Sequence, residues 1–248
     1  MKDSRQLNSL ALQMRRVWGQ DAYAPIDIFS IVSSLKNMTV IKYPLSSSIS
    51  GMTTKIDEDY IICINSHMSK GRQRFTLAHE LYHVLFEDIN GRVICGLDMS
   101  CNKSDSEKEA DQFASYLLMP YDSLLQYNDN HCHWNLEGII KAQQYFQISH
   151  QAILFRLLND GMIDSLTYEK YKSIMVSYEA AKLGYNTELY QADDESSQYF
   201  TTGEYIRKVQ MTYDLNRISL SKKEEYLLDA FREDIVYGLD KGAMLLND

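Results

Sequence analysis

The stretch Arg74-Phe75-Thr76-Leu77-Ala78-His79-Glu80-Leu81-Tyr82-His83-Val84-Leu85-Phe86 decides how this chain is interpreted, because it places the pattern His-Glu-x-x-His in a segment typical of a helix. Residues i and i+4 lie on one face of a helix, so the imidazoles of His79 and His83 can reach one metal ion. Glu80 lies beside that face and can reach a water molecule on the metal. Such an arrangement hydrolyses peptide bonds. The alternative is a helix that carries two histidines by chance.

A hydrolytic zinc site needs three protein ligands and one open position, so a third ligand is expected on a second helix. Residues 106–120 favour a helix, contain no internal glycine or proline, and end at Pro120. One face of this helix is apolar and partly made of small residues, which allows close approach to another helix: Ala110, Ala114, Leu117 and Leu118. Glu107 and Asp111 lie on the same face, one turn apart.

Two acidic side chains on a face that points into the core are costly unless a cation neutralises them. We therefore predict Glu107 as the third ligand, and Asp111 as the residue that orients a ligand histidine through its second ring nitrogen. Glu109 points away from that face and is the weaker candidate. The alternative is an exposed acidic first turn that favours the helix dipole. That alternative accounts for Glu107 and Glu109 but not for Asp111.

These residues resemble the ImmA/IrrE metallopeptidases. That family combines an R-x-R-F-T-x-A-H-E-x-x-H helix with a following E-x-x-A-[DN]-x-F-A-x-x-L-[LM]-x-P helix, and both patterns occur here in order, over 72–83 and 107–120. The resemblance covers roughly residues 8–165 and extends only loosely into the tail. It implies a small zincin-like fold, a bound zinc ion, and proteolysis of a helix-turn-helix transcriptional repressor. Tyr82 stands where the family often has glycine, and a ring there is expected to narrow the substrate cleft.

Composition agrees with a soluble enzyme of one or two domains, since the chain has 248 residues and 45% hydrophobic residues. The net charge of −9 argues against direct nucleic-acid binding, which needs a basic patch. No apolar run reaches the ~18 residues of a membrane span, and the N-terminus has no apolar signal core. We therefore expect a cytoplasmic protein.

The predicted fold class is α+β. Helices are expected over Ser9–Trp18 and Ile26–Leu35, followed by three strands over residues 39–43, 49–55 and 60–65. The acidic link 57–59 should make a hairpin of the last two strands, and the sheet is expected to be small and antiparallel. The edge around Tyr60–Asn65 would then accept the substrate as an added strand. Residues 87–104 show no clear period and are predicted to form a loop.

Residues 136–165 predict a helix-turn-helix-like segment, with helices over Leu136–Phe146 and from a cap at Ser149 to a stop at Gly161. Only His150 and Arg156 would be available to contact DNA, so packing is the preferred role. Two more helices are expected in the tail, over 203–215 and 221–237, the second with a capping box of Ser221 and Glu224. We expect a metallopeptidase domain over 1–165, including segment 136–165, and a mainly helical extension of unknown role over 166–248.

Several other polar residues leave their roles open. The cysteines Cys63, Cys95, Cys101 and Cys132 show no C-x-x-C spacing and are expected to be free thiols, with Cys63 acting as a small buried hydrophobe. The cluster His131-Cys132-His133 has no common zinc spacing and is interpreted as a polar loop. Stabilisation of the reaction's oxyanion remains open among His131, His133, Tyr116, Tyr121 and Tyr127. The sequence thus predicts a zinc endopeptidase with Glu80 as base, and the alternative is a zinc-containing regulatory protein that binds a repressor or antitoxin without cutting it.

Overall fold

A computed structural model gives the fold and describes residues 2–88, 92–96, 104–131 and 134–238. The described residues form one five-stranded sheet of order β4-β2-β3-β1-β5. Its strands are β1 (Met38–Tyr43), β2 (Ile49–Ile56), β3 (Asp59–Asn65), β4 (Arg92–Gly96) and β5 (Phe200–Gly203). β1 runs parallel to β3, whereas the other neighbouring pairs are antiparallel. The class is α+β as predicted, but the sheet is mixed, and the prediction of an antiparallel sheet was wrong.

The reason for the mixed sheet is the path between β1 and β2. β2 does not pair with β1, because β3 inserts between them. The buried side chain of Asn65 fixes this path: its amide nitrogen donates to the carbonyls of Ser46 and Ile49 at 3.0 and 2.7 Å, and its oxygen accepts from the backbone of Leu45 at 3.1 Å. A buried amide whose hydrogen bonds are all made stabilises a single arrangement of the connection.

The position of β3 overturns one sequence-based expectation. β3 is hydrogen-bonded on one side to β2 and on the other to β1, so Tyr60–Asn65 cannot accept an added strand. The outer strands are β4 and β5. β4 also lies inside the segment predicted as a loop, and that prediction was wrong for residues 92–96. Its backbone pairs with β2, a tertiary partner that a local pattern does not reveal.

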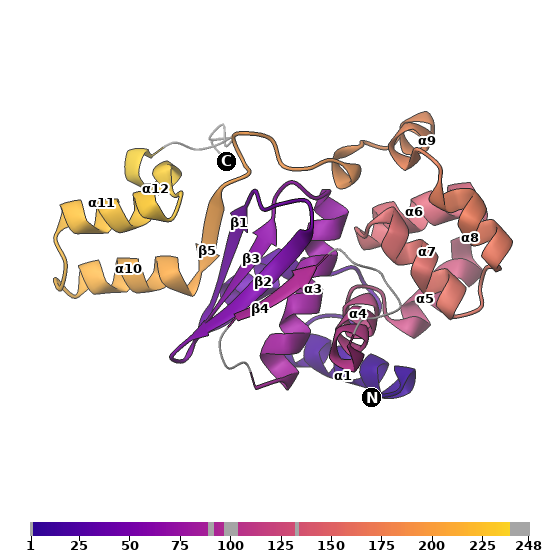
Figure 1. The fold of residues 1–248 in the computed structure, drawn as a ribbon, viewed down its shortest axis with the longest axis horizontal. Coiled ribbons are helices and arrows are strands. Elements are labelled where there is room, and N and C mark those ends of the chain that lie inside the picture. The colour runs from indigo at the N-terminus through magenta and orange to yellow at the C-terminus, as the bar shows by residue number, and fades with distance from the viewer. Residues whose placement is uncertain (1, 89–91, 97–103, 132–133, 239–248) are drawn as a thin grey trace.

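Helices cover one face of the sheet. The N-terminal part contributes α1 (Ser4–Val17) and α2 (Ile28–Ser34), and the predicted metal-binding segments form α3 (Lys70–Phe86) and α4 (Asp105–Leu118). Figure 1 shows α1, α3 and α4 on the same side of the sheet. Leu77 and Leu81 of α3 are fully buried in one core with Ile62 and Ile64 of β3. The predicted small-residue face of α4 is fully buried as well, which explains its close packing on α3.

Residues 121–182 form a group of helices beyond α4, namely α5 (Tyr121–His131), α6 (Leu136–Phe146), α7 (His150–Asn159), α8 (Ser165–Lys172) and α9 (Val176–Lys182). Ser149 caps α7 by accepting from the backbone of Ala152, as predicted. Both side chains considered for DNA contact are buried. His150 contacts Gln143 and the Tyr171 carbonyl, and Arg156 donates to the Met119 carbonyl at 3.0 Å and contacts Asp160. In this structure both side chains therefore hold helices together.

The tail belongs to the sheet. After η1 (Glu188–Tyr190), strand β5 pairs antiparallel with β1, and α10 (Glu204–Asp214), α11 (Leu220–Asp229) and α12 (Glu233–Tyr237) follow on the opposite side of the sheet from α3 and α4 (Figure 1). The predicted helix over 221–237 is interrupted at Phe231, whose φ is +59°, and its cap is Ser219 instead of Ser221. No helix among the described residues has both the length and the apolar character needed to cross a bilayer.

The tail also contacts the start of α3, the predicted metal-binding helix. The backbone N–H of Lys70, the first residue of α3, donates to the Gln191 carbonyl at 2.9 Å. Asp193 donates from its backbone to the Ser66 carbonyl at 3.1 Å, and its carboxylate pairs with Lys42 of β1 at 3.0 Å. We refer to residues 188–193 as the strap. It connects α3 to β1.

Candidate metal centre

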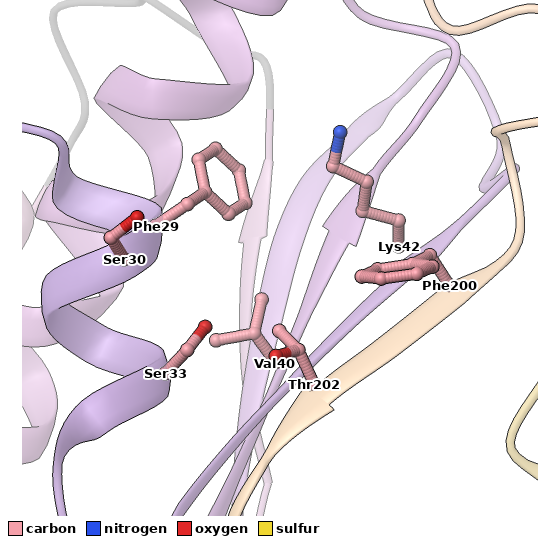
Figure 2. Close-up of a pocket in the computed structure, with 7 residues that line it drawn as sticks. All are labelled: Phe29, Ser30, Ser33, Val40, Lys42, Phe200 and Thr202. Carbon is pink, nitrogen blue, oxygen red and sulfur yellow. The ribbon is translucent and has the colours of Figure 1, made fainter. Parts of the chain in front are cut away.

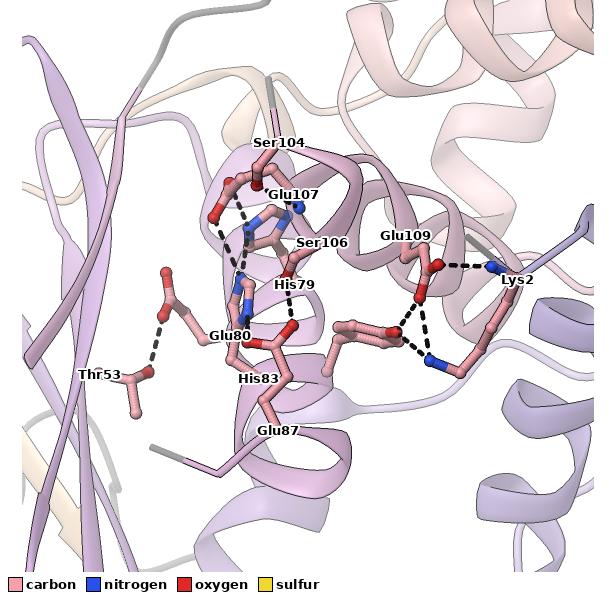
Figure 3. A network of polar contacts seen from close by, with 11 residues as sticks. Lys2, Thr53, His79, Glu80, His83, Glu87, Ser104, Ser106, Glu107 and Glu109 are labelled. Carbon is pink, nitrogen blue, oxygen red and sulfur yellow. Dashed lines mark hydrogen bonds and ion pairs between the residues drawn. The ribbon is translucent and has the colours of Figure 1, made fainter. Parts of the chain in front are cut away.

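The two histidines lie one turn apart on α3, are buried, and face α4. Their Nε2 atoms are 3.3 Å apart. Glu107, in the first turn of α4, approaches both from the other side: its carboxylate oxygens are 3.3 Å from His79 Nε2 and 3.4 Å from His83 Nε2. Figure 3 shows the Glu107 carboxylate facing both imidazoles. One ligand atom from each of the three residues lies within 4.8 Å of the others, so together they could hold a metal ion.

Two further carboxylates fix the orientation of the rings. His79 Nδ1 lies 2.9 Å from Asp111 of α4, the contact that the sequence predicts. His83 Nδ1 lies 2.8 Å from Glu87, the residue that caps the C-terminus of α3. A carboxylate can only accept, so each neutral ring carries its proton on Nδ1 and turns the lone pair of Nε2 inward. Two lone pairs and a carboxylate then converge on one point, which is a donor set that fits a divalent cation.

Glu87 is a site residue that the sequence analysis missed, because it was assigned to the start of a loop. Besides His83, its carboxylate accepts a hydrogen bond from the hydroxyl of Ser106 in the first turn of α4. Glu87 therefore joins the end of α3 to the start of α4 (Figure 3). The available signal was its spacing of four residues from His83, which puts Glu87 one turn further along, just beyond the end of α3.

Glu80 points toward the sheet. Its side chain is 0% exposed and accepts a hydrogen bond of 2.6 Å from the hydroxyl of Thr53 on β2. Its second oxygen, Oε1, is buried and has no hydrogen-bond partner among the described residues. A buried carboxylate with one oxygen held and one free can still accept a proton at the free oxygen.

Glu109 belongs to a different cluster. Its carboxylate accepts a hydrogen bond from the Tyr82 hydroxyl and one of 2.9 Å from the Lys2 ammonium group, so it joins α3, α4 and the N-terminal segment. Figure 3 shows Glu109 and Lys2 on the side of α4 away from Glu107. The Tyr82 hydroxyl and then Lys2 lower the pKa of Glu109 to about 2. The weaker third-ligand candidate thus has a structural role.

The ring of Tyr82 lies beside a predicted ligand, edge-on to His83 at a ring-centroid distance of 6.0 Å. The side chain is buried and packs at ring-centroid distances of 5.3 Å from Phe86 and 5.6 Å from Phe113. The ring therefore fills space between α3 and α4, and its effect on a substrate cleft stays a prediction.

The candidates for oxyanion stabilisation are not brought to the metal cluster by any described contact. Tyr116 packs under the guanidinium of Arg156, and Tyr127 packs against Tyr145 and Phe146. Tyr121 is exposed at the start of α5. His133 and Cys132 lie outside the described residues, and His131 ends α5 with a side chain that the structure does not describe.

Among the side chains that the structure describes, no cysteine adds a ligand to the cluster. Cys63 is a free thiol on β3, as predicted, but it is only half-buried. Burial raises the pKa of its thiol to about 11, which keeps the group neutral. Cys101 and Cys132 lie outside the described residues, and the structure describes only the backbone of Cys95.

A cavity of about 430 Å³ lies between α2, β1 and β5 (Figure 2). It contains none of the predicted site residues, and its lining consists of Phe29, Ser30, Ser33, Val40, Lys42, Phe200 and Thr202. The ammonium group of Lys42 is already paired with Asp193. This cavity therefore adds no residue to the cluster on α3 and α4.

Fold and site together define a class: an α+β protein whose His-Glu-x-x-His helix and a second acidic helix converge on a three-ligand cluster. Residues 35–158 match the peptidase family described as the IrrE N-terminal-like domain, and this match spans half of the chain. The chain belongs to that metallopeptidase family. A comparison with curated proteins finds no match.

Proposed function

We propose that the protein is a zinc-dependent endopeptidase that cleaves a helix-turn-helix transcriptional repressor in the cytoplasm. One observation carries the catalytic part: two carboxylate-oriented histidines and Glu107 converge beside Glu80, whose free oxygen is buried. Two nitrogen ligands and one carboxylate are a donor set typical of hydrolytic zinc sites with an open position.

The residues of the chain divide the work of peptide hydrolysis. His79, His83 and Glu107 would hold the ion, and Asp111 and Glu87 would keep the two imidazoles in the ligating tautomer. A bound zinc ion supplies a Lewis acid that lowers the pKa of water toward ~7. Glu80 accepts the proton of the attacking water at its free oxygen and passes it to the leaving amine.

The substrate part of the proposal rests on the family and on the sheet. Extended peptides commonly bind by adding a strand to a free sheet edge. β4 is the outer strand next to β2, and β2 carries the partner of Glu80, so we assign the substrate strand to β4 instead of β3. A net charge of −9 suits a basic, DNA-binding protein partner better than DNA itself.

A second candidate function is a regulatory protein that binds zinc and captures a repressor or antitoxin without cutting it. Its metal cluster would be identical, because the three ligands alone do not require turnover. The two functions differ in what Glu80 does. Its full burial, with one oxygen held by Thr53, matches a base that is kept in place, and this favours the peptidase.

The experiment combines the zinc-loaded protein with a purified helix-turn-helix repressor encoded by an adjacent reading frame. If the protein is an endopeptidase, it should cut the repressor into defined fragments. These fragments should be absent when a chelator is added and when the Glu80→Gln variant is used. Stable co-elution without fragments, unchanged by Glu80→Gln, supports the regulatory alternative.

A companion experiment compares the intact repressor with a short peptide that spans the cleavage site. Remote contacts supply orientation, so we expect a higher kcat/KM on the intact repressor than on the peptide. Equal values on both substrates would leave an unselective peptidase.

A further inference from the structure

The carboxylate of Glu80 occupies a slot between α3 and β2. Both Glu80 and Thr53 are 0% exposed, and the hydroxyl of Thr53 donates to Glu80 Oε2 at 2.6 Å. The other oxygen has no hydrogen-bond partner among the described residues. Taking a carboxylate out of water is costly, so a single strong hydrogen bond has a large influence on where this side chain lies. Thr53 makes that bond.

Gly51 forms the other wall of the slot. A Cβ at position 51 would lie 2.7 Å from the Thr76 methyl carbon Cγ2 and 3.1 Å from Glu80 Oε1. The Cys63 carbonyl oxygen would also lie at 3.1 Å. The requirement for glycine is therefore one of space: β2 approaches α3 so closely that any side chain would press on Glu80 or Thr76.

Gly51 and Thr53 are two residues apart on β2 and so point to the same face of the sheet. They pair with Ile64 and Ile62 of β3, both fully buried on the face that α3 covers. Thr53 holds Oε2 of Glu80, and Gly51 leaves room at Oε1. Figure 3 shows Glu80 directed from the metal helix toward Thr53.

We propose that Thr53 is a positioning residue for the general base, and that Gly51 keeps space open at the oxygen that takes the proton. The inference rests on the proposed peptidase function. Thr53 holds the carboxylate by donating to Oε2, so Oε1 is the atom that accepts a proton from the attacking water and returns it to the leaving amine. Thr53 itself exchanges no proton with the substrate.

The test compares three single variants as zinc-loaded full-length protein. Thr53→Val removes the hydroxyl at nearly constant shape, Thr53→Ser keeps it, and Thr54→Val makes the same chemical change at the neighbouring position, which faces the other side of the sheet. Removal of such supporting partners typically costs about 10- to 100-fold, so we expect kcat to fall by that factor in Thr53→Val. KM and zinc content should stay close to wild type, and Thr53→Ser and Thr54→Val should keep most of the activity.

Equal losses in Thr53→Val and Thr53→Ser, or wild-type kcat in Thr53→Val, would overturn the proposal. Should Thr53→Val fail to fold, Thr53→Ala carries the same comparison with Thr53→Ser. Gly51→Ala gives an independent result: with Thr53 intact, kcat should still fall because the added methyl group presses on Glu80.

A crystal structure of zinc-loaded Thr53→Val separates this inference from the proposed function. The inference predicts that the Glu80 carboxylate leaves the slot, whereas an unchanged Glu80 conformation contradicts it. This result does not depend on cleavage. A wild-type protein that cleaves no repressor would refute the peptidase function, while the structure would still show whether Thr53 holds Glu80.

Discussion

Glu87 accepts from His83 Nδ1 across 2.8 Å, although it lies just beyond the last residue of α3. Together with the Asp111–His79 contact of 2.9 Å, this gives each histidine its own carboxylate. Asp111 comes from α4, and Glu87 is joined to α4 through Ser106. The orientation of the two imidazoles therefore depends on how α3 and α4 pack against each other.

Removal of Glu87 should weaken metal binding without removing a ligand. Glu87→Gln keeps an acceptor but loses the negative charge that favours the ligating form of His83, so we expect zinc affinity to fall by about 10- to 100-fold. Competition with a chromophoric chelator measures the change. Glu58→Gln, in the exposed turn of the β2–β3 hairpin, is the charge-matched control. Equal affinity in the two variants would contradict the role of Glu87.

The ligand assignment predicts one zinc ion per chain. His79→Ala should lose most of the bound metal, and Glu107→Gln should bind it more weakly because an amide oxygen is a poorer ligand than a carboxylate. Glu109→Gln, which has the same change two residues away, should keep full stoichiometry because Glu109 contacts Tyr82 and Lys2. Elemental analysis of dialysed, folded samples gives the result. Metal loss in Glu109→Gln but not in Glu107→Gln would reverse the assignment.

The role of Glu80 in catalysis should be separable by mutation from the role of the metal ligands. Glu80→Gln nearly preserves shape, and its amide carbonyl can still accept from Thr53, so zinc content and thermal stability should remain near wild type. Cleavage should be abolished, because an amide cannot take the proton. Cleavage of the repressor and zinc content are measured on the same preparation. A wild-type cleavage rate in this variant would falsify the mechanism.

Two truncations should distinguish the parts of the tail. A chain ending at residue 203 keeps the strap and β5, whereas a chain ending at residue 165 loses both and exposes the edge of β1. We expect the shorter chain to have the lower Tm and the weaker zinc retention, because Lys70 of α3 loses its bond to Gln191. Thermal unfolding with and without chelator measures both. Indistinguishable melting of the two truncated chains would show that the strap and β5 contribute little.

The sequence by itself determined the two helices of the candidate metal site and the residues that they bring together. Helical periodicity is local, so the spacing of His79, His83 and Glu80, and of Glu107 and Asp111, already placed these side chains on two faces that must meet. The apolar face of α4 predicted that meeting, because its small residues permit close contact. The choice of Glu107 over Glu109 followed from the same geometry, and the structure places Glu107 at the histidines.

Only the tertiary structure decided the order of the strands and the surroundings of the site. Hydrogen bonds between strands join residues far apart in sequence, so no local pattern shows that β3 lies inside the sheet, that β5 comes from the tail, or that Asn65 directs the chain between β1 and β2. The hydrogen bond from the Thr53 hydroxyl to Glu80 is likewise a tertiary contact, because it links a strand to a helix. Periodicity assigns a side chain to a face, but its partner across that face is set by how the elements pack.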